Sequence, residues 1–306
     1  MIFRIRHATH FRYDKPAYES HNEVRVVPRD SAGQRCLSFE LEVTPKAAVL
    51  AYEDSFKNKV HAISVHPPHD ELSIVAVSVV ERLAPRVPSP LRVPFSEFLA
   101  EDAARMAQHY EFLTPSRYVP FSDRLRKFFW SARPAPTETV LEYTLRVVRY
   151  VRDQFEYEKN KTHVHSSVDD ILTAGGGVCQ DFAHLTIGLL RLAGVPARYV
   201  SGYLAPYEAG GSNVGEQASH AWVEALLPGA GWTGFDPTLR CRTGDHHVRV
   251  AIGRDYADVT PLRGVYRSAG SKGEMRVELS IERDDGASVL LATEEGHTQS
   301  QSQAQQ

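Results

Sequence analysis

Hydrophobic and polar residues alternate with a period of two over roughly the first 86 residues, beginning with Phe3 and Ile5. Successive side chains of a β-strand point to opposite faces, so this alternation predicts strands that are buried on one face. Runs of the same kind cover residues 37–43 and 72–80. Four prolines between positions 85 and 94 then interrupt the pattern, because proline cannot donate a hydrogen bond within a sheet. The pattern therefore predicts an all-β N-terminal part that ends at a linker near residues 85–94.

Beyond this linker the apolar residues recur at intervals of three and four, which is the period of an α-helix. Two helical segments follow Ser96 and Thr137, whose hydroxyls can accept hydrogen bonds from the backbone at a helix start. The first of them is expected to run to residue 108. A short helix over residues 168–172 should stop at the glycines 175–177, since glycine readily adopts left-handed backbone angles. The next segment, residues 180–193, is apolar on nearly every side and predicts a buried helix.

Strand patterns return after this buried helix. They cover residues 198–204, 221–227, 231–235, 248–252, 275–283 and 289–292. Helices followed by a run of strands are typical of an α+β domain with an antiparallel sheet. Residues 294–306 are polar and repetitive, and they contain too few apolar groups to offset the entropy lost on ordering. We therefore expect a β-rich domain over residues 1–90, an α+β domain over residues 91–293 and a disordered tail over residues 294–306.

The composition indicates which classes of binding partner the protein can have. The chain has 306 residues, 35 Lys plus Arg against 38 Asp plus Glu, and a formal net charge of −3. This balance disfavours a dedicated binder of nucleic acid or of an anionic membrane, since both need an excess of basic residues. The opening MIFRIRHATHFRY lacks an apolar signal core, and the three cysteines are far apart in the sequence. We therefore expect a cytoplasmic protein that acts on a small molecule or a peptide.

Cys179 is the first candidate for a catalytic residue, because of its position in the sequence. In the segment GGGVCQDFAH it follows glycines directly and stands at the first turn of the predicted buried helix. The N-terminus of a helix favours negative charge, and the thiolate is the nucleophilic form of cysteine. A small buried structural cysteine would fit the same position equally well. Cys36 and Cys241 lack such a context, and we interpret both as inert.

A thiol nucleophile needs a base, and His220 and Asp236 have suitable positions. His220 begins the strand HAWVEALL and Asp236 ends the next strand, WTGFD, across a tight connection at residues 228–231. In an antiparallel pair the two side chains share a face if the register sum is even. Asp236 would then accept the imidazole N–H and orient His220 toward Cys179. Taken separately, each residue also fits a surface histidine or an aspartate at a turn.

Three segments carry a family resemblance: GVCQDFAHLTIGLLRLAGVPARYVSGYL, ASHAWVEALLPGAGWTGFDPT and VRVAIGRDYADVTPLRGVY. They resemble the bacterial transglutaminase-like proteins of the papain-like cysteine-enzyme superfamily, and residues 3–30 are similar to the β-rich region that accompanies that core. The resemblance implies a β-sandwich-like N-terminal domain followed by a core of helices packed on an antiparallel sheet. By the same resemblance Cys179 is the nucleophile, His220 the base and Asp236 the residue that orients the base.

These observations together predict a thiol enzyme that attacks an amide carbonyl and forms an acyl-enzyme. We expect hydrolysis of a peptide or another amide first, because crosslinking needs an amine channel that excludes water and the sequence shows none. Transfer to an amine is the second hypothesis, and a non-catalytic interaction module with the same fold is the third. The backbone N–H of Cys179 is the expected oxyanion donor. No cofactor is expected, and the oligomeric state is not predicted.

Several neighbouring residues receive a structural interpretation. Gln180 and Asp181 are expected to cap the helix rather than to take part in catalysis. Trp222 should share a face with His220, where it either walls the cleft or belongs to the core. Residues 206–217 contain glycines and polar groups and predict a flexible loop beside the cleft. The histidine clusters, at residues 66–70, 163–165 and 246–247, lack zinc-site spacing, so we interpret them as solvated or capping and expect no metal.

Overall fold

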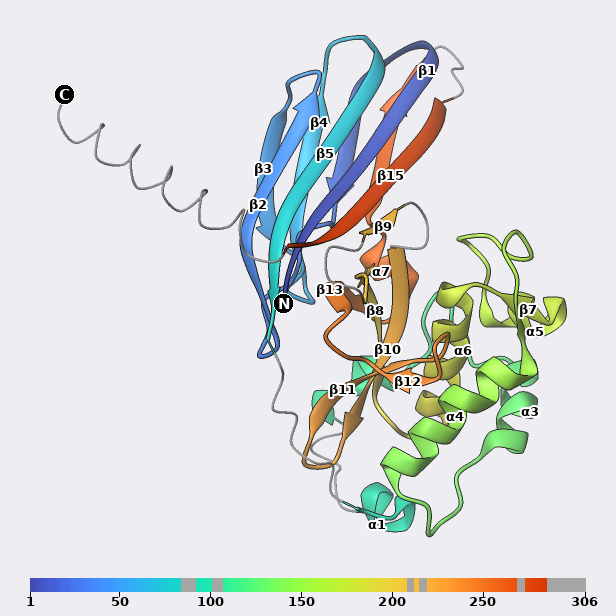
Figure 1. Cartoon of the computed structure of the whole chain (residues 1–306). Helices are drawn as coiled ribbons and strands as arrows, with labels where there is room; N and C mark the ends of the chain where they lie inside the picture. The colour runs from blue at the N-terminus through green and yellow to red at the C-terminus, as the bar shows by residue number, and fades with distance from the viewer. Residues whose placement is uncertain (84–91, 101–106, 208–211, 215–218, 269–272, 285–306) are drawn as a thin grey trace.

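The computed structural model describes residues 1–83, 92–100, 107–207, 212–214, 219–268 and 273–284. Strands fill one part of the molecule, and helices cover a second sheet in the other part (Figure 1). The strands of both larger sheets pair antiparallel. The predicted α+β class is therefore confirmed. Among the described residues, no helix has both the length and the apolar character needed to cross a bilayer.

The N-terminal strands are organised around β1. The five strands are β1 (Ile2–Val24), β2 (Gln34–Thr44), β3 (Ala48–Glu53), β4 (Lys59–Val65) and β5 (His69–Arg82). The first half of β1 pairs with β5, and its last residues pair with β4. Phe3 and Ile5 are buried while their neighbours Arg4 and Arg6 are exposed, as the period of two predicts. One long strand thus joins two groups of strands into a single β structure.

The last strands of the chain belong to this N-terminal β structure. Both β14 (Leu262–Arg267) and β15 (Gly273–Asp284) pair with β1, and β15 also carries the short β9 (Ser212–Val214). The strand pattern at residues 275–283 predicts a place in the sheet of the second half, and this assignment is wrong. An alternating pattern predicts a strand but contains no information about its partner. The domain limits at residues 90 and 293 stay a prediction.

The second sheet has the order β12, β11, β10, β8, β13. These strands are β8 (Ala197–Leu204), β10 (Ser219–Leu227), β11 (Gly231–Asp236), β12 (Cys241–Arg242) and β13 (His247–Gly253). A tight turn joins β10 to β11, and in it Gly229 and Gly231 have φ angles of 70° and 68°. Residues other than glycine rarely adopt such angles. The turn therefore fixes the β10–β11 register, on which the site depends.

Helices pack around the buried α6 (Cys179–Leu192), which contacts β10, β8 and α4. The remaining elements are α1 (Phe95–Ala100), the 3₁₀ helix η1 (Tyr110–Phe112), α3 (Asp123–Ala132), α4 (Val140–Gln154), β6 (Glu156–Tyr157), α5 (Val168–Ala174), β7 (Gly176–Gly177) and α7 (Tyr256–Val259). Gly175 ends α5 with a φ of 73°, as predicted for a glycine stop. Within the segment predicted to run to residue 108, the structure describes residues 96–100 and 107–108. The predicted linker (84–91), the strand at 289–292 and the tail lie outside the described residues.

The cap of α4 differs from the predicted one. Thr139, not Thr137, precedes the helix, and its hydroxyl accepts the backbone N–H of Glu142 at 3.2 Å. The carboxylate of Glu142 accepts the N–H of Thr139 in return, at 3.0 Å. This reciprocal pair needs an acidic residue three positions after the cap. Thr139 has Glu142 at that position, whereas Thr137 has Val140.

The two parts of the molecule meet at β13, the edge strand of the second sheet. The side-chain amide of Gln34 donates to the carbonyl of Arg249 and accepts its N–H, both at 2.8 Å. The amide of Asn58 pairs in the same way with Ile252, at 2.8 and 2.9 Å. Both amides are buried. They satisfy backbone groups that an edge strand otherwise leaves without a partner.

Replacement of Ile281 by alanine should destabilise the whole protein. Ile281 on β15 is fully buried in one apolar cluster with Phe3 and Ile5. Loss of a buried isoleucine side chain lowers the free energy of unfolding by about 2–5 kcal/mol, which urea denaturation measures. Val277→Ala on the same strand is the control, because Val277 is 49% exposed and should change stability by about 0.5 kcal/mol or less. Equally small effects would contradict the packing of β15.

Candidate active site

Cys179 is the first residue of α6, as the sequence predicts. The backbone N–H of Val178, the residue before it, donates to the Asp181 carboxylate at 2.8 Å, and the Thr162 hydroxyl donates to the same oxygen at 2.5 Å. A Cβ atom at Gly177 would collide with this carboxylate. Asp181 therefore caps the helix, which confirms its structural interpretation, and glycine is required directly before the cap.

Gln180 holds the chain that precedes α5 against the start of α6. Its side-chain nitrogen donates to the carbonyl of Val164 at 3.1 Å, and the residue is buried. Burial also raises the pKa of the Asp181 carboxyl, against the hydrogen bonds from Thr162 and Val178. Both residues after Cys179 thus support the helix start on which the thiol is mounted.

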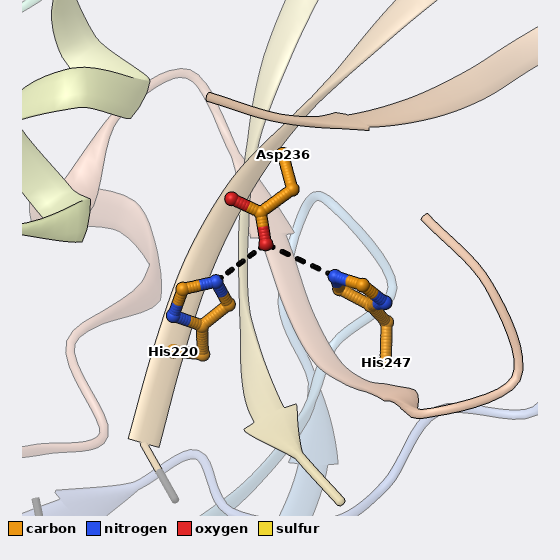
Figure 2. A group of neighbouring side chains, drawn as sticks. All are labelled: His220, Asp236 and His247. Carbon is orange, nitrogen blue, oxygen red and sulfur yellow. Dashed lines mark hydrogen bonds and ion pairs between the residues drawn. The ribbon is translucent and has the colours of Figure 1, made fainter. Parts of the chain in front are cut away.

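His220 and Asp236 lie side by side on neighbouring strands. The imidazole Nε2 of His220 donates to Oδ2 of Asp236 at 2.6 Å, and both residues are buried (Figure 2). The β10–β11 register pairs Val223 with Phe235, and its sum is even, which is the condition stated from the sequence. By this register Asp236 lies across from Trp222 and diagonal to His220, within reach of an imidazole.

His220 also hydrogen-bonds to Cys179. Asp236 occupies Nε2, so Nδ1 is the ring nitrogen left to face the thiol. Burial lowers the pKa of His220, but the hydrogen bonds to Asp236 and Cys179 outweigh burial and raise this pKa to about 10. The structure thus brings the three predicted residues together in the order thiol, imidazole, carboxylate, and it favours the imidazolium form at neutral pH.

The carboxylate of Asp236 is fully buried and accepts four hydrogen bonds. Oδ1 accepts the backbone N–H groups of Thr238 and Leu239, at 2.8 and 3.0 Å. Oδ2 accepts from His220 and from His247, the latter at 3.0 Å. Burial by itself raises the pKa of Asp236, but the histidine hydrogen bonds outweigh it and hold the pKa well below its usual range. Four is also the number of acceptor positions that a carboxylate offers.

His247 is a residue of the site that the sequence analysis missed. From the sequence, residues 246–247 are interpreted as solvated or capping, yet His247 is 4% exposed and contacts Asp236. A signal was present, because His247 directly precedes the strand predicted at residues 248–252. The order of the strands was needed to place it beside Asp236, and no local pattern contains that order. Its neighbour His246 lies elsewhere, with Nδ1 2.9 Å from the Pro206 carbonyl.

The ligand atoms of His220, Asp236 and His247 lie within 4.8 Å of one another, and these residue types also bind zinc. Hydrogen bonding accounts for their arrangement. The backbone N–H of Gly244 donates to Nδ1 of His247 at 3.2 Å, which leaves the proton of this ring on Nε2. Both histidines then direct an N–H at the Asp236 carboxylate, whereas a metal ion requires a nitrogen lone pair. The absence of a metal stays a prediction.

The remaining candidates have the following surroundings. Trp222 is buried, packs with Val200 and Ile252, and lies with its ring centroid 5.3 Å from that of His247 and 6.3 Å from that of His220. It is therefore a core residue that also contacts the site. Burial raises the pKa of the Cys36 and Cys241 thiols, which agrees with their interpretation as inert. Residues 208–211 and 215–218 of the predicted loop lie outside the described residues.

Comparisons with known proteins find similarity to two family models and to several relatives. The family model of the transglutaminase-like superfamily matches residues 131–237, which include all three predicted site residues. The model of the bacterial transglutaminase-like N-terminal region matches residues 3–81. The chain is 36% identical over 269 residues to an uncharacterized protein of Mycobacterium leprae, covering 88% of this chain and 94% of that protein.

Two further similarities concern proteins whose names carry an activity. The crystal structure of a candidate cysteine protease from Cytophaga hutchinsonii matches with a TM-score of 0.70 and 25% identity, covering 91% of this chain and 90% of that one. A 77-residue stretch is 40% identical to a protein-glutamine gamma-glutamyltransferase of Pseudomonas aeruginosa, covering 24% of this chain and 12% of that protein.

We expect iodoacetamide to alkylate Cys179 faster than Cys36 or Cys241 near neutral pH. The thiolate is the reactive form, and Cys179 faces an imidazolium whereas burial raises the pKa of the other two thiols. Because the pKa of His220 is raised to about 10, the rate at Cys179 should stay nearly constant through neutral pH. Mass spectrometry of the alkylated peptides measures the three rates.

The His220→Ala variant is the matched comparison for this profile. Without the imidazolium, alkylation of Cys179 should rise with pH as for an ordinary cysteine, which titrates near 8.5. The rate near pH 6 should then fall on the order of 100-fold. Identical pH profiles for the wild type and this variant would show that His220 does not act on the thiol.

Proposed function

We propose that this chain, which belongs to the transglutaminase-like superfamily, is a cysteine-dependent hydrolase of amide or peptide bonds. The observation that carries the proposal is the position of His220. This buried imidazole hydrogen-bonds to the thiol of Cys179 and to the carboxylate of Asp236. A nucleophile beside a base, with the base oriented by a third group, is the arrangement that nucleophilic catalysis requires.

Cys179 acts as the nucleophile. Its sulfur attacks the amide carbonyl carbon, and the carbonyl becomes a tetrahedral oxyanion. His220 then gives its proton to the leaving nitrogen, the carbon–nitrogen bond breaks, and an amine departs from a thioester. Water attacks the thioester carbonyl and passes a proton to His220, which releases the carboxylic acid and restores the thiolate–imidazolium pair. Asp236 keeps the imidazole oriented through both halves of the reaction.

The start of α6 contributes to the stabilisation of charge. The first N–H groups of a helix have no partner within the helix and attract negative charge. The backbone N–H of Cys179 is one of these groups, so it is suited to donate to the oxyanion that forms next to its own side chain. The thiolate before the attack and the oxyanion after it benefit from the same end of the helix.

Hydrolysis is the first function and transfer to an amine is the second. Water is available at any open site, whereas transfer needs a second binding site that holds the amine and excludes water. The similarity to the candidate cysteine protease extends over 91% of this chain, and the similarity to the glutamyltransferase over 24%. Both observations support hydrolysis as the first choice. A non-catalytic module would have no need of a thiol, imidazole and carboxylate in this order.

A library of peptides and simple amides tests the proposal. Wild-type protein should cleave at least one member and Cys179→Ala none, with unchanged circular dichroism for the variant. Addition of a labelled primary amine to a glutamine peptide tests the second function. Incorporation of the label without release of the free acid would favour transfer, and reactivity retained by Cys179→Ala would contradict both functions.

The variant Asp236→Asn should fold and lose turnover. The remaining amide oxygen can accept from only one pair of donors, either the two backbone N–H groups or the two histidines, and the N–H₂ group cannot accept from the other pair. In serine triads the same change costs about 10⁴-fold in turnover. A cysteine depends less on its base, so we expect a loss of roughly 10- to 1000-fold in kcat. Unchanged kcat would reduce the triad to a dyad.

A further inference from the structure

The Asp236 carboxylate is held by two histidines, and the proposed reaction uses one of them. His220 exchanges a proton with the thiol and the leaving group. His247 binds the same oxygen, Oδ2, at 3.0 Å but does not take part in the reaction (Figure 2). A second imidazole buried against a charged catalytic group needs a physical explanation, because burial of a polar side chain is costly unless hydrogen bonds replace those to water.

His247 reaches Asp236 from a different part of the sheet than His220. It is the first residue of β13, whereas His220 is on β10, and β8 lies between these two strands. The Trp222 ring contacts it edge-on, with an interplanar angle of 82°. The Trp222 ring therefore limits the movement of the imidazole of His247, and the Nε2 atom of this imidazole faces Asp236.

The hydrogen bonds of His247 also define where its proton is. The backbone N–H of Gly244 is a donor, so Nδ1 of His247 must accept at 3.2 Å with its lone pair. The single proton of the neutral ring is then on Nε2, and it points at Asp236. His247 thus accepts at Nδ1 and donates to Asp236 from Nε2, whereas His220 favours the imidazolium form.

We propose that His247 is a positioning residue: by donating Nε2–H to the Asp236 oxygen that binds His220, it keeps that carboxylate oriented and ionised. This inference rests on the proposed function, because it concerns the same site. Without His247 the carboxylate loses one of its four donors in a buried position. Burial favours the protonated form of a carboxyl, and with fewer hydrogen bonds to oppose burial the pKa of Asp236 rises. The proton that His220 shares with Asp236 over 2.6 Å becomes easier to transfer to the carboxylate.

The N-terminal strands help to hold this arrangement. The guanidinium of Arg82, at the end of β5, donates to the carbonyls of Gly244 and Asp245 at 3.2 and 3.3 Å. Burial lowers the pKa of Arg82 to about 10, so it stays charged at neutral pH. Arg82 therefore anchors the turn whose N–H fixes the proton of His247, and the β-rich part of the molecule contributes to the geometry of the site.

Other titratable groups near Asp236 do not interfere with a test at acid pH. On the elements around it, Cys241 on β12 and Tyr207 after β8 are affected by its charge. Burial raises the pKa of both groups, and the negative charge of Asp236 adds to the effect. Both stay neutral below neutral pH. Burial also raises the pKa of Asp181, two residues from Cys179, but Asp181 is unchanged in every His247 variant, so a difference between the profiles reports on Asp236 and its two histidines.

Two substitutions of His247 separate its hydrogen bond from its volume. His247→Leu fills the space without a donor, whereas the amide nitrogen of His247→Gln can reach the position of Nε2. The control is His246→Gln, because the adjacent His246 binds the Pro206 carbonyl and not Asp236. The readout is the rate of iodoacetamide alkylation at Cys179 from acid to neutral pH, which needs no substrate. For a substrate found in the library, kcat and KM are measured as well.

We expect His247→Leu to slow alkylation near pH 6 roughly 3- to 30-fold, which is part of the effect of losing one hydrogen bond to a charged group, because the loss reaches Cys179 only through Asp236 and His220. The acid limb of its profile should move to higher pH, because a less stabilised Asp236 carboxylate is protonated sooner. In turnover, kcat should fall with little change in KM. His247→Gln should restore most of the rate, and His246→Gln should match the wild type.

Three outcomes would overturn the proposal: a wild-type profile for His247→Leu, a failure of His247→Gln to improve on His247→Leu, or an equal effect of His246→Gln. If His247→Leu does not fold, the alkylation profiles of His247→Gln and His247→Asn are compared instead. The asparagine amide is too short to reach Asp236, so equal profiles of these two variants would contradict the inference. The proposed function fails separately, if His220→Ala leaves the alkylation of Cys179 unchanged.

Discussion

The buried negative charge of Asp236 is the constraint on which the site depends. A carboxylate without access to water is stable only where hydrogen-bond donors replace the water. Its donors come from three places: His220 on β10, His247 on β13 and the backbone that follows β11. The strand order, the hairpin register and the turn after the hairpin must all be formed before this charge is satisfied. The hydrogen bonds that the site needs therefore form only when the sheet has folded.

A second buried carboxylate on the same sheet shows how the partner decides the role. Glu224, four residues after His220 on β10, is fully buried and forms ion pairs with Arg198 and Arg249. A guanidinium remains protonated throughout the physiological range, so this cluster is permanently charged and can only support the structure. Asp236 is instead paired with imidazoles, which can give up a proton to a bound group as the proposed reaction requires. Equal burial thus gives an ion pair with two arginines in one place and hydrogen bonds to two histidines in the other.

The sequence predicts those features that depend on neighbours along the chain. The start of α6 at Cys179 follows from glycines and an apolar run, and the approach of His220 to Asp236 follows from one short hairpin. The sequence also indicates Thr139 as the N-terminal cap of α4, because Glu142 follows three residues later. The pairing of β15 with β1 and the contact of His247 with Asp236 join segments whose association depends on the order of strands. An alternating pattern of apolar and polar residues is compatible with several different orders of strands in a sheet.

The amides of Gln34 and Asn58 on β13 have a consequence for how such chains are divided or recombined. These side chains act as a substitute for a neighbouring strand on the edge of the second sheet. A core excised without them presents the backbone of Arg249 and Ile252 as an open edge, ready to pair with another polypeptide. Chimeras made by exchanging the N-terminal region between relatives would therefore stay monodisperse only where both amides, and their spacing along the edge, are carried over.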